Sequence, residues 1–90
     1  MEATKKPRQS SDYRLEAIDG EVLLYHPERT KTLYLNETAS LVWNLCSGER
    51  TTDEIVRLLE EAFPDAEATV SHDVEQALRR LHEHKAIEYR

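Results

Sequence analysis

The side chains of this 90-residue chain that could bind a metal or carry out catalysis share no common pattern. His82 and His84 are two positions apart, so on a helix they would project from different faces and would not share a metal ion. The chain contains neither a CxxC nor an HExxH motif, and Cys46 has no second cysteine with which to form a zinc site or an internal disulfide. We therefore expect no bound metal.

The acidic residues and the glycines do not suggest catalysis either. Adjacent acids such as Asp53-Glu54 and Glu60-Glu61 would point in different directions on a helix, which suits a solvated face better than paired acid and base groups. The chain has two glycines, Gly20 and Gly48, too few for a glycine-rich phosphate-binding loop. The sequence thus predicts a protein that is not an enzyme and needs no cofactor.

Cys46 lies on the apolar face of a predicted helix. Apolar residues recur at Ala39, Val42, Trp43 and Cys46, the i, i+3, i+4, i+7 spacing of an amphipathic helix. A catalytic cysteine has to be partly exposed, with its thiolate stabilised by nearby positive charge. We therefore interpret Cys46 as a small core residue.

Length and composition are typical of one small folded domain. Hydrophobic residues make up 39% of the chain and charged residues 33%, which favours a globular protein over a disordered one. No apolar run approaches the roughly 20 residues that cross a bilayer, and the polar, basic start does not resemble a secretory signal. We expect a cytoplasmic protein that does not contact membranes.

Charge divides the chain into two parts. Residues 1–14 carry a net charge of +2, whereas the remainder holds sixteen acids against eight bases. Residues 1–11 lack any periodicity and predict a flexible basic tail ahead of a domain at residues 12–90. Because phosphate-backbone binding needs Lys and Arg, the acidic body argues against a nucleic-acid partner.

Alternating apolar and polar residues predict three short strands, at residues 13–17, 21–25 and 31–35. Asp19-Gly20 joins the first two and is a strong hairpin-turn sequence, and residues 26–30 form the next turn. Such strands form an antiparallel meander with the first and third strands at its edges.

Three helices are predicted after the strands, over about residues 37–46, 52–63 and 67–84. Asn36 would cap the first helix, and Thr51 with Glu54 would form a capping box at the second. Residues 86–89 would close the domain as a short strand or an extended tail. The apolar positions that the second helix is expected to bury are Ile55, Leu58, Leu59 and Ala62, with Phe63 as a further candidate.

This order predicts an α+β fold resembling a winged helix-turn-helix, with a three-stranded antiparallel meander followed by three helices. Winged helices often bind DNA, so a DNA-binding regulator is one alternative function. The third helix, however, carries four acids against Arg79 and Arg80, and the second carries four acids against Arg57. Both helices would repel phosphates.

The third strand offers a second possibility, recognition of a peptide. An edge strand has unpaired N–H and C=O groups, which an extended peptide can satisfy by adding a strand. Leu33, Leu35 and the flank of the third helix would then form an apolar groove for its side chains. The alternative, about as well supported by the pattern, is that both leucines are ordinary core residues and the tail covers the edge.

The chain resembles the PqqD family, small proteins also described as RiPP recognition elements. The resemblance covers roughly residues 13–89 and is most specific in the LNETA block, Leu35–Ala39, and the run CSGERTTDEI, Cys46–Ile55. Membership implies no catalysis. It implies a peptide chaperone that binds the leader segment of a ribosomally made precursor peptide and presents it to a modifying enzyme, often a radical SAM enzyme.

In the family, the leader lies as an added strand beside the third strand, in a groove bounded by the third helix. Carried onto this sequence, the resemblance places four residues on the strand side: Thr32, Leu33, Tyr34 and Leu35. On the helix side, the residues expected to face the groove are Val70, Asp73, Val74, Ala77 and Leu81. The acidic body would favour a leader that carries Lys or Arg, although interface charge acts mostly on association rate and specificity.

The sequence therefore predicts a peptide chaperone of the PQQ pathway or of another radical SAM peptide pathway. Its expected partners are a precursor peptide and a modifying enzyme, and its exposed edges would permit either a monomer or a homodimer. Two alternatives stay open: the DNA-binding regulator, and a non-catalytic subunit that binds a protein partner without any leader.

Overall fold

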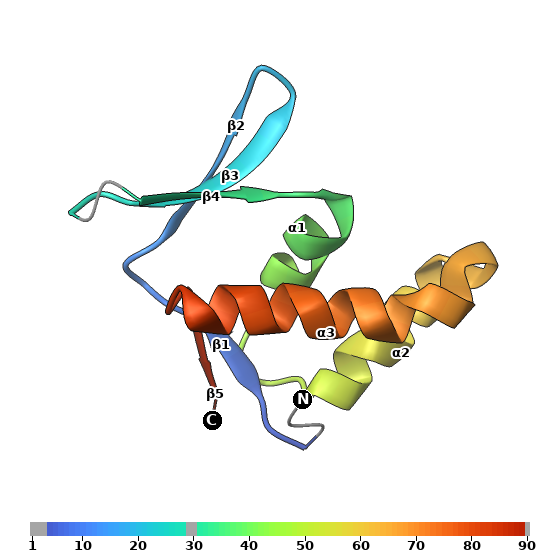
Figure 1. The fold of residues 1–90 in the computed structure, drawn as a ribbon. Helices are drawn as coiled ribbons and strands as arrows, with labels where there is room; N and C mark the ends of the chain where they lie inside the picture. The colour runs from blue at the N-terminus through green and yellow to red at the C-terminus, as the bar shows by residue number, and fades with distance from the viewer. Residues whose placement is uncertain (1–3, 29–30, 90) are drawn as a thin grey trace.

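The computed structural model describes residues 4–28 and 31–89 of the chain. Its elements form a mixed α/β arrangement, drawn in Figure 1. In chain order they are β1 (Pro7–Gln9), β2 (Arg14–Ile18), β3 (Glu21–His26), β4 (Lys31–Leu35), α1 (Glu37–Leu45), α2 (Thr52–Ala62), the 3-10 turn η1 (Pro64–Ala66), α3 (Glu67–Glu83) and β5 (Ile87–Tyr89).

The predicted meander is present as an antiparallel sheet with the strand order β2-β3-β4. Asp19 and Gly20 join β2 to β3 with φ angles of 52° and 81°, the two positive values that a type I′ hairpin turn requires. The prediction of three strands, with the first and third at the edges, is confirmed. Arg29 and Thr30, in the second predicted turn, lie outside the described residues.

Part of the segment predicted to be a flexible tail is a strand. Residues 7–9 form β1, which pairs antiparallel with β5, and Pro7 is fully buried. The backbone N–H of Gly48 donates to the carbonyl of Pro7 at 2.9 Å, so the loop after α1 holds the same segment. For residues 7–9 the expectation was wrong, because the partner strand lies about 80 residues away and no local pattern reveals it. Residues 1–3 of that segment lie outside the described residues.

The helix starts follow the predicted capping residues. The side chain of Asn36 accepts a hydrogen bond from the N–H of Ala39 at 2.8 Å. At α2, the Thr51 hydroxyl accepts from the N–H of Glu54 at 3.1 Å, and the Glu54 carboxylate accepts from the N–H of Thr51 at 2.9 Å. The predicted capping box is therefore confirmed.

The buried face of α2 differs from the expected one. Ile55 and Leu59 are buried as predicted, but Leu58 and Phe63 are exposed and Val56 is buried in their place. Apolar residues occur around much of this helix, so periodicity alone could not select its inner face. The exposed position of Ala62 agrees with this rotation.

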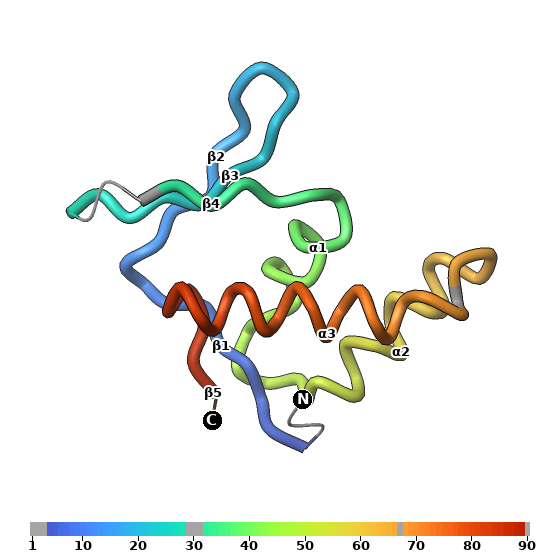
Figure 2. The backbone as a smooth tube through the Cα atoms, in the orientation of Figure 1, coloured from blue at the N-terminus to red at the C-terminus, as the bar shows by residue number. Residues whose placement is uncertain are grey.

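Helix α3 lies at the centre of the molecule. Figure 1 shows the three-stranded sheet above α3, the β1–β5 pair below it, and α1 between the sheet and α3. Figure 2 shows the same path as a tube, with β1 and β5 on the side of α3 away from the three-stranded sheet. Buried side chains of α1, α2 and α3 form one core with β3, β4 and β5. The hydroxyl of Tyr13, just before β2, donates to the carbonyl of His84 at 2.6 Å and ties the sheet to the end of α3.

Among residues 4–28 and 31–89, no helix has both the length and the apolar character needed to cross a bilayer.

Candidate functional site

The free edge of β4 is the first component of the candidate site. Strand β4 pairs with β3 on one side, and no other described strand pairs with it. In an antiparallel pair, alternate residues of an edge strand direct their N–H and C=O groups away from the partner. Residues 7–9 of the predicted tail pair with β5 on the opposite side of α3, so this described part of the tail does not cover the edge. Strand β4 therefore offers main-chain hydrogen-bonding groups to an extended peptide.

A hollow of about 120 Å³ lies beside the end of β4, and we call it the groove. Three elements enclose it: the end of β4, the first turn of α1 and one face of α3. Its apolar lining comes from Leu35, Ala39, Ala77 and Leu81. Its polar lining consists of Asn36, Thr38, Asp73, Gln76 and Arg80.

A second hollow of about 710 Å³ shares Leu35, Asn36 and Arg80 with the groove. This adjoining hollow lies between the β2–β3 hairpin turn, the end of β4 and α1. Its apolar lining includes Val22 and Leu41, which pack partly buried against the core. The shared residues make the two hollows neighbours around the end of β4, so a bound chain could contact both.

The predicted strand residues divide between the two faces of the sheet. Leu33 and Leu35 face the helices and are buried in the core, and only Leu35 also lines the groove. Thr32 and Tyr34 line another hollow of about 420 Å³ on the outer face, where Tyr34 is 56% exposed, and Tyr34 also lines the adjoining hollow. Strand geometry explains the division, because successive side chains point to opposite faces.

The predicted helix residues are only partly brought together. Asp73, Ala77 and Leu81 line the groove beside Leu35. Val70 and Val74 do not line it, because they are buried in the core among the helices. Helical spacing of seven and three residues places Val70 and Val74 on the same side of α3 as Ala77.

Two residues of α3 that line the groove, Gln76 and Arg80, were not predicted. They follow Asp73 by three and seven positions, so helical spacing from Asp73 could have identified them. Both side chains are polar, so the apolar periodicity of this helix does not mark them.

Arg80 is the unpaired cation of the site. It forms no ion pair or side-chain hydrogen bond with any residue that the structure describes. By contrast, Arg79 pairs with Glu75 at 3.0 Å, and Arg57 pairs with Asp53 at 3.2 Å. Arg80 therefore retains its hydrogen-bond donors for a ligand.

Reactive groups are not gathered at this site. Cys46 is fully buried, and burial raises the pKa of its thiol to about 12. Within the described parts of the chain, His, Cys, Asp and Glu side chains form no group of three or more that could hold a metal ion. The groove offers main-chain hydrogen bonds, an apolar lining and one free cation, an arrangement suited to binding an extended peptide.

A strand edge beside a helix-lined groove defines a class of peptide-recognition domain, and the comparisons agree with that class. The family described as coenzyme PQQ synthesis protein D, or PqqD, matches residues 21–87. The chain belongs to the PqqD family. This identification confirms the resemblance recognised in the sequence.

Curated relatives support the same assignment. The PqqA binding protein of Pseudomonas fluorescens Pf-5 is 37% identical over 79 residues, covering 84% of this chain and 82% of the relative. The PqqA binding protein of Rahnella aquatilis is 36% identical over 72 residues, covering 80% of this chain and 72% of the relative.

Two solved structures share the fold. TbiB1 in complex with the TbiA(beta) leader peptide matches with a TM-score of 0.71 and 26% identity, over 90% of this chain and 94% of TbiB1. The second is the PqqD truncation of Methylobacterium extorquens PqqCD, a stand-alone RiPP recognition element solved by NMR. It matches with a TM-score of 0.70 and 25% identity, over 91% of this chain and 87% of the PqqD truncation. The predicted fold class, a three-stranded antiparallel sheet followed by three helices, is confirmed.

Proposed function

We propose that this protein binds the leader segment of a ribosomally made precursor peptide and presents it to a modifying enzyme. The observation that carries this proposal is the free edge of β4 beside the groove of α3. TbiB1, a structural neighbour, has been solved with a leader peptide, and the curated relatives are PqqA binding proteins. The favoured precursor is therefore of the PqqA type, and the favoured enzyme is a radical SAM enzyme that acts on it.

In the proposed complex the leader adds a strand to β4. The backbone of Thr32, Leu33, Tyr34 and Leu35 supplies the pairing groups, and a side chain of the leader enters the groove between Leu35, Ala77 and Leu81. Asp73 lies at the groove's polar rim, and Val70 and Val74 support the helix from the core. Main-chain pairing tolerates sequence differences, and the groove adds selection.

A leader must bind firmly and still be released after modification. Micromolar affinity, about −8 kcal/mol, suits that requirement, and a single added strand with one or two occupied hollows can provide it. The chain would then raise the local concentration of the precursor at the enzyme without taking part in the chemistry.

The direct test is a titration of the ¹⁵N-labelled protein with a synthetic PqqA peptide. We expect a dissociation constant in the micromolar range or below, with the amide signals of residues 32–35 among the most strongly shifted. A scrambled peptide of equal composition serves as the control. Unchanged amides of Leu33 to Leu35 at saturating PqqA peptide would overturn strand addition.

A matched pair of variants tests the groove. Gln76 is exposed and lines the groove, so Gln76→Trp fills it without disturbing the core. Ser71 is exposed on the same helix and lines neither the groove nor the adjoining hollow, so Ser71→Trp is the control. We expect Gln76→Trp to weaken leader binding about tenfold or more, about 1.4 kcal/mol, and Ser71→Trp to change it less than twofold.

The role of the enzyme partner has its own test. The purified radical SAM enzyme of the same host is assayed on its precursor with and without this protein. We expect faster modification with the wild-type chain, and a smaller gain with Gln76→Trp. A rate independent of the chain would remove the delivery role and leave leader binding in place.

The DNA-binding alternative finds no support at α3. This helix carries four acids against two arginines, Arg79 pairs with Glu75, and Arg80 lines the groove. A mobility-shift assay with duplex DNA should therefore detect no binding at physiological salt.

A further inference from the structure

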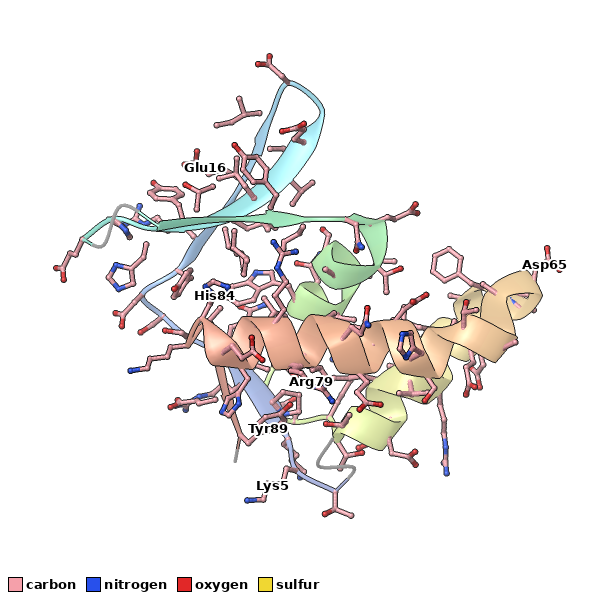
Figure 3. All side chains as sticks on the ribbon, viewed as in Figure 1. Lys5, Glu16, Asp65, Arg79, His84 and Tyr89 are labelled. Atoms are coloured by element: carbon pink, nitrogen blue, oxygen red, sulfur yellow. The ribbon has the colours of Figure 1, made fainter. Side chains whose placement is uncertain are left out.

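Arg79 and Arg80 are adjacent on α3 but differ in their surroundings. Figure 3 shows Arg79 on the side of α3 away from the three-stranded sheet, where its guanidinium pairs with Glu75 at 3.0 Å. Arg80 lies about 100° further around the helix and lines both the groove and the adjoining hollow. One arginine thus has a partner within its own helix, and the other has none among the described residues.

The negative charges near Arg80 do not satisfy it. Glu21 and Glu37 line the adjoining hollow with Arg80, but neither carboxylate comes within 4.0 Å of a guanidinium nitrogen. Asp73 lines the groove seven residues earlier on the same helix, and its carboxylate forms no ion pair with Arg80. A guanidinium presents a planar fork of donors that matches a carboxylate, so a carboxylate is the ligand group that suits the exposed Arg80 side chain best.

Arg80 lies beside the end of β4, where an added strand would pass. Both hollows that contain Arg80 also contain Leu35, the last residue of β4. A strand added to the free edge of β4 would pass Arg80 while one of its apolar side chains lies against Leu35, Ala77 and Leu81. Arg80 would then contact a side chain of the leader close to that apolar residue.

We propose that Arg80 is a specificity-determining residue that recognises an Asp or Glu side chain of the leader. This inference rests on the proposed function and names the class of peptide that the site selects: an extended segment with an acidic residue close to an apolar one. An ion pair with Arg80 would fix the register of the added strand, because main-chain pairing alone permits slippage.

The proposal differs from what the net charge suggests. The chain carries a net charge of −6, which by itself would favour a basic leader. Charges on the surface are screened over about 8 Å at physiological ionic strength, so remote acids have little effect within the groove. Glu21, Glu37 and Asp73 line the same hollows, so the preference at this point depends on which side chain of the peptide reaches the Arg80 guanidinium.

The test compares the two neighbouring arginines. The probe is a synthetic peptide with the sequence of PqqA from the Pseudomonas fluorescens strain whose PqqA binding protein resembles this chain. We expect Arg80→Ala to weaken binding about fivefold to twentyfold, between the effects of an exposed ion pair and of a buried charged hydrogen bond. Arg79→Ala, the matched control, should change it less than twofold.

A set of peptides locates the partner. Each Asp or Glu of the probe is changed singly to Asn or Gln, and each peptide is titrated into wild-type and Arg80→Ala protein. We expect one acidic residue whose removal weakens binding to the wild type as much as Arg80→Ala does and has no further effect on that variant. A peptide with Lys at this position should regain affinity for Arg80→Glu.

Each outcome is decisive. If the wild type does not bind the peptide at β4, the proposed function and this inference fall together. If the wild type binds but Arg80→Ala behaves like Arg79→Ala, or no single acid is coupled to Arg80, only this inference falls. Arg80→Gln replaces Arg80→Ala should the latter fail to fold, as judged by circular dichroism.

Discussion

Cys46 illustrates how a reactive residue type becomes a structural one. Its side chain is fully buried beside Val42 and Trp43 in the core, and its backbone N–H donates to the carbonyl of Trp43 at 3.1 Å. Loss of hydration on burial costs the charged thiolate more free energy than the neutral thiol, and this raises the pKa of Cys46 to about 12. At neutral pH the thiol stays protonated and inaccessible to solvent.

The first prediction concerns this thiol. Because the thiolate is the nucleophile, Cys46 of the native protein should react with Ellman's reagent at pH 8 at least about a hundredfold more slowly than in guanidinium. The measurement is the absorbance of released thionitrobenzoate under both conditions. Equal rates would mean that Cys46 is open to solvent in the native state and that its core assignment is wrong.

The N-terminus of α2 shows how a few polar atoms start a helix. Thr51 and Glu54 exchange two hydrogen bonds, and these satisfy N–H groups that the helix itself leaves free. The hydrogen bond that Glu54 accepts from the Thr51 backbone N–H is the main reason that the pKa of Glu54 lies below its ordinary value, and the bond to the Thr51 side chain acts in the same direction. The folded protein therefore favours ionised Glu54.

The second prediction is a pH dependence at this cap. A carboxyl whose pKa is lowered by folding contributes stability that is present above its unfolded pKa, about 4.3, and is lost as the pH falls through the folded pKa. Glu54→Gln can still cap but cannot ionise, so wild type should exceed this variant in urea stability at pH 7, and the difference should shrink toward pH 3. A difference that is constant between the two pH values would contradict it.

Strand β1 contributes to the domain through contacts that no local pattern reveals. The backbone N–H of Gln9 donates to the carbonyl of Cys46, and the side-chain Nε2 of Gln9 donates to the carbonyl of Trp43. The carbonyl of Pro7 accepts from the backbone N–H of Gly48. These bonds attach β1 to the loop after α1, and its pairing with β5 attaches it to the C-terminal end of the described chain.

The third prediction is that removing residues 1–9 destabilises the domain. The deletion breaks the pairing with β5 and exposes backbone groups near Cys46, so it should lower the free energy of unfolding by about 2 kcal/mol or more. Chemical denaturation measures the loss. The control is Arg8→Ala, which removes only a half-exposed ion pair with Glu88 and should cost less than about 1 kcal/mol. Equal stability of the deletion variant would show that β1 is dispensable.

An element can be predicted from the sequence when the residues that determine it lie close together in the chain. The hairpin at Asp19-Gly20 and the caps at Asn36 and Thr51 depend on residues within a few positions of one another, and the sequence predicts all of them. Strand β1 and the exposed position of Leu58 depend on distant segments, so the sequence could not predict them.

The candidate site shows the same division. The edge position of β4 and the contributions of Leu35, Asp73, Ala77 and Leu81 follow from strand order and helical facing. The depth of Val74 in the core and the free state of Arg80 depend on how α3 is packed and on which carboxylates reach which arginine. These three-dimensional facts are not encoded in spacing along one helix.

At the scale of the whole molecule, α3 connects the binding site to the rest of the domain. It packs against α1, α2 and β5, and its groove residues share the helix with the core residues Val70, Val74 and Leu78. Since the helix is held from several sides, the groove exists before any peptide binds. Binding then orders mainly the peptide, so most of the loss of conformational entropy occurs in the peptide and little in the protein.

The last prediction follows from binding to a preformed site. A leader that binds only the folded state, at β4, must raise the free energy of unfolding. The increase is about 2.7 kcal/mol when the free peptide is at a hundred times its dissociation constant. Thermal unfolding with increasing PqqA peptide should show a midpoint that rises with its concentration, and native hydrogen exchange should slow at residues 32–35. Gln76→Trp should need a correspondingly higher peptide concentration for the same shift. A scrambled peptide that raises the midpoint equally would mean that the stabilisation does not arise at the β4 edge.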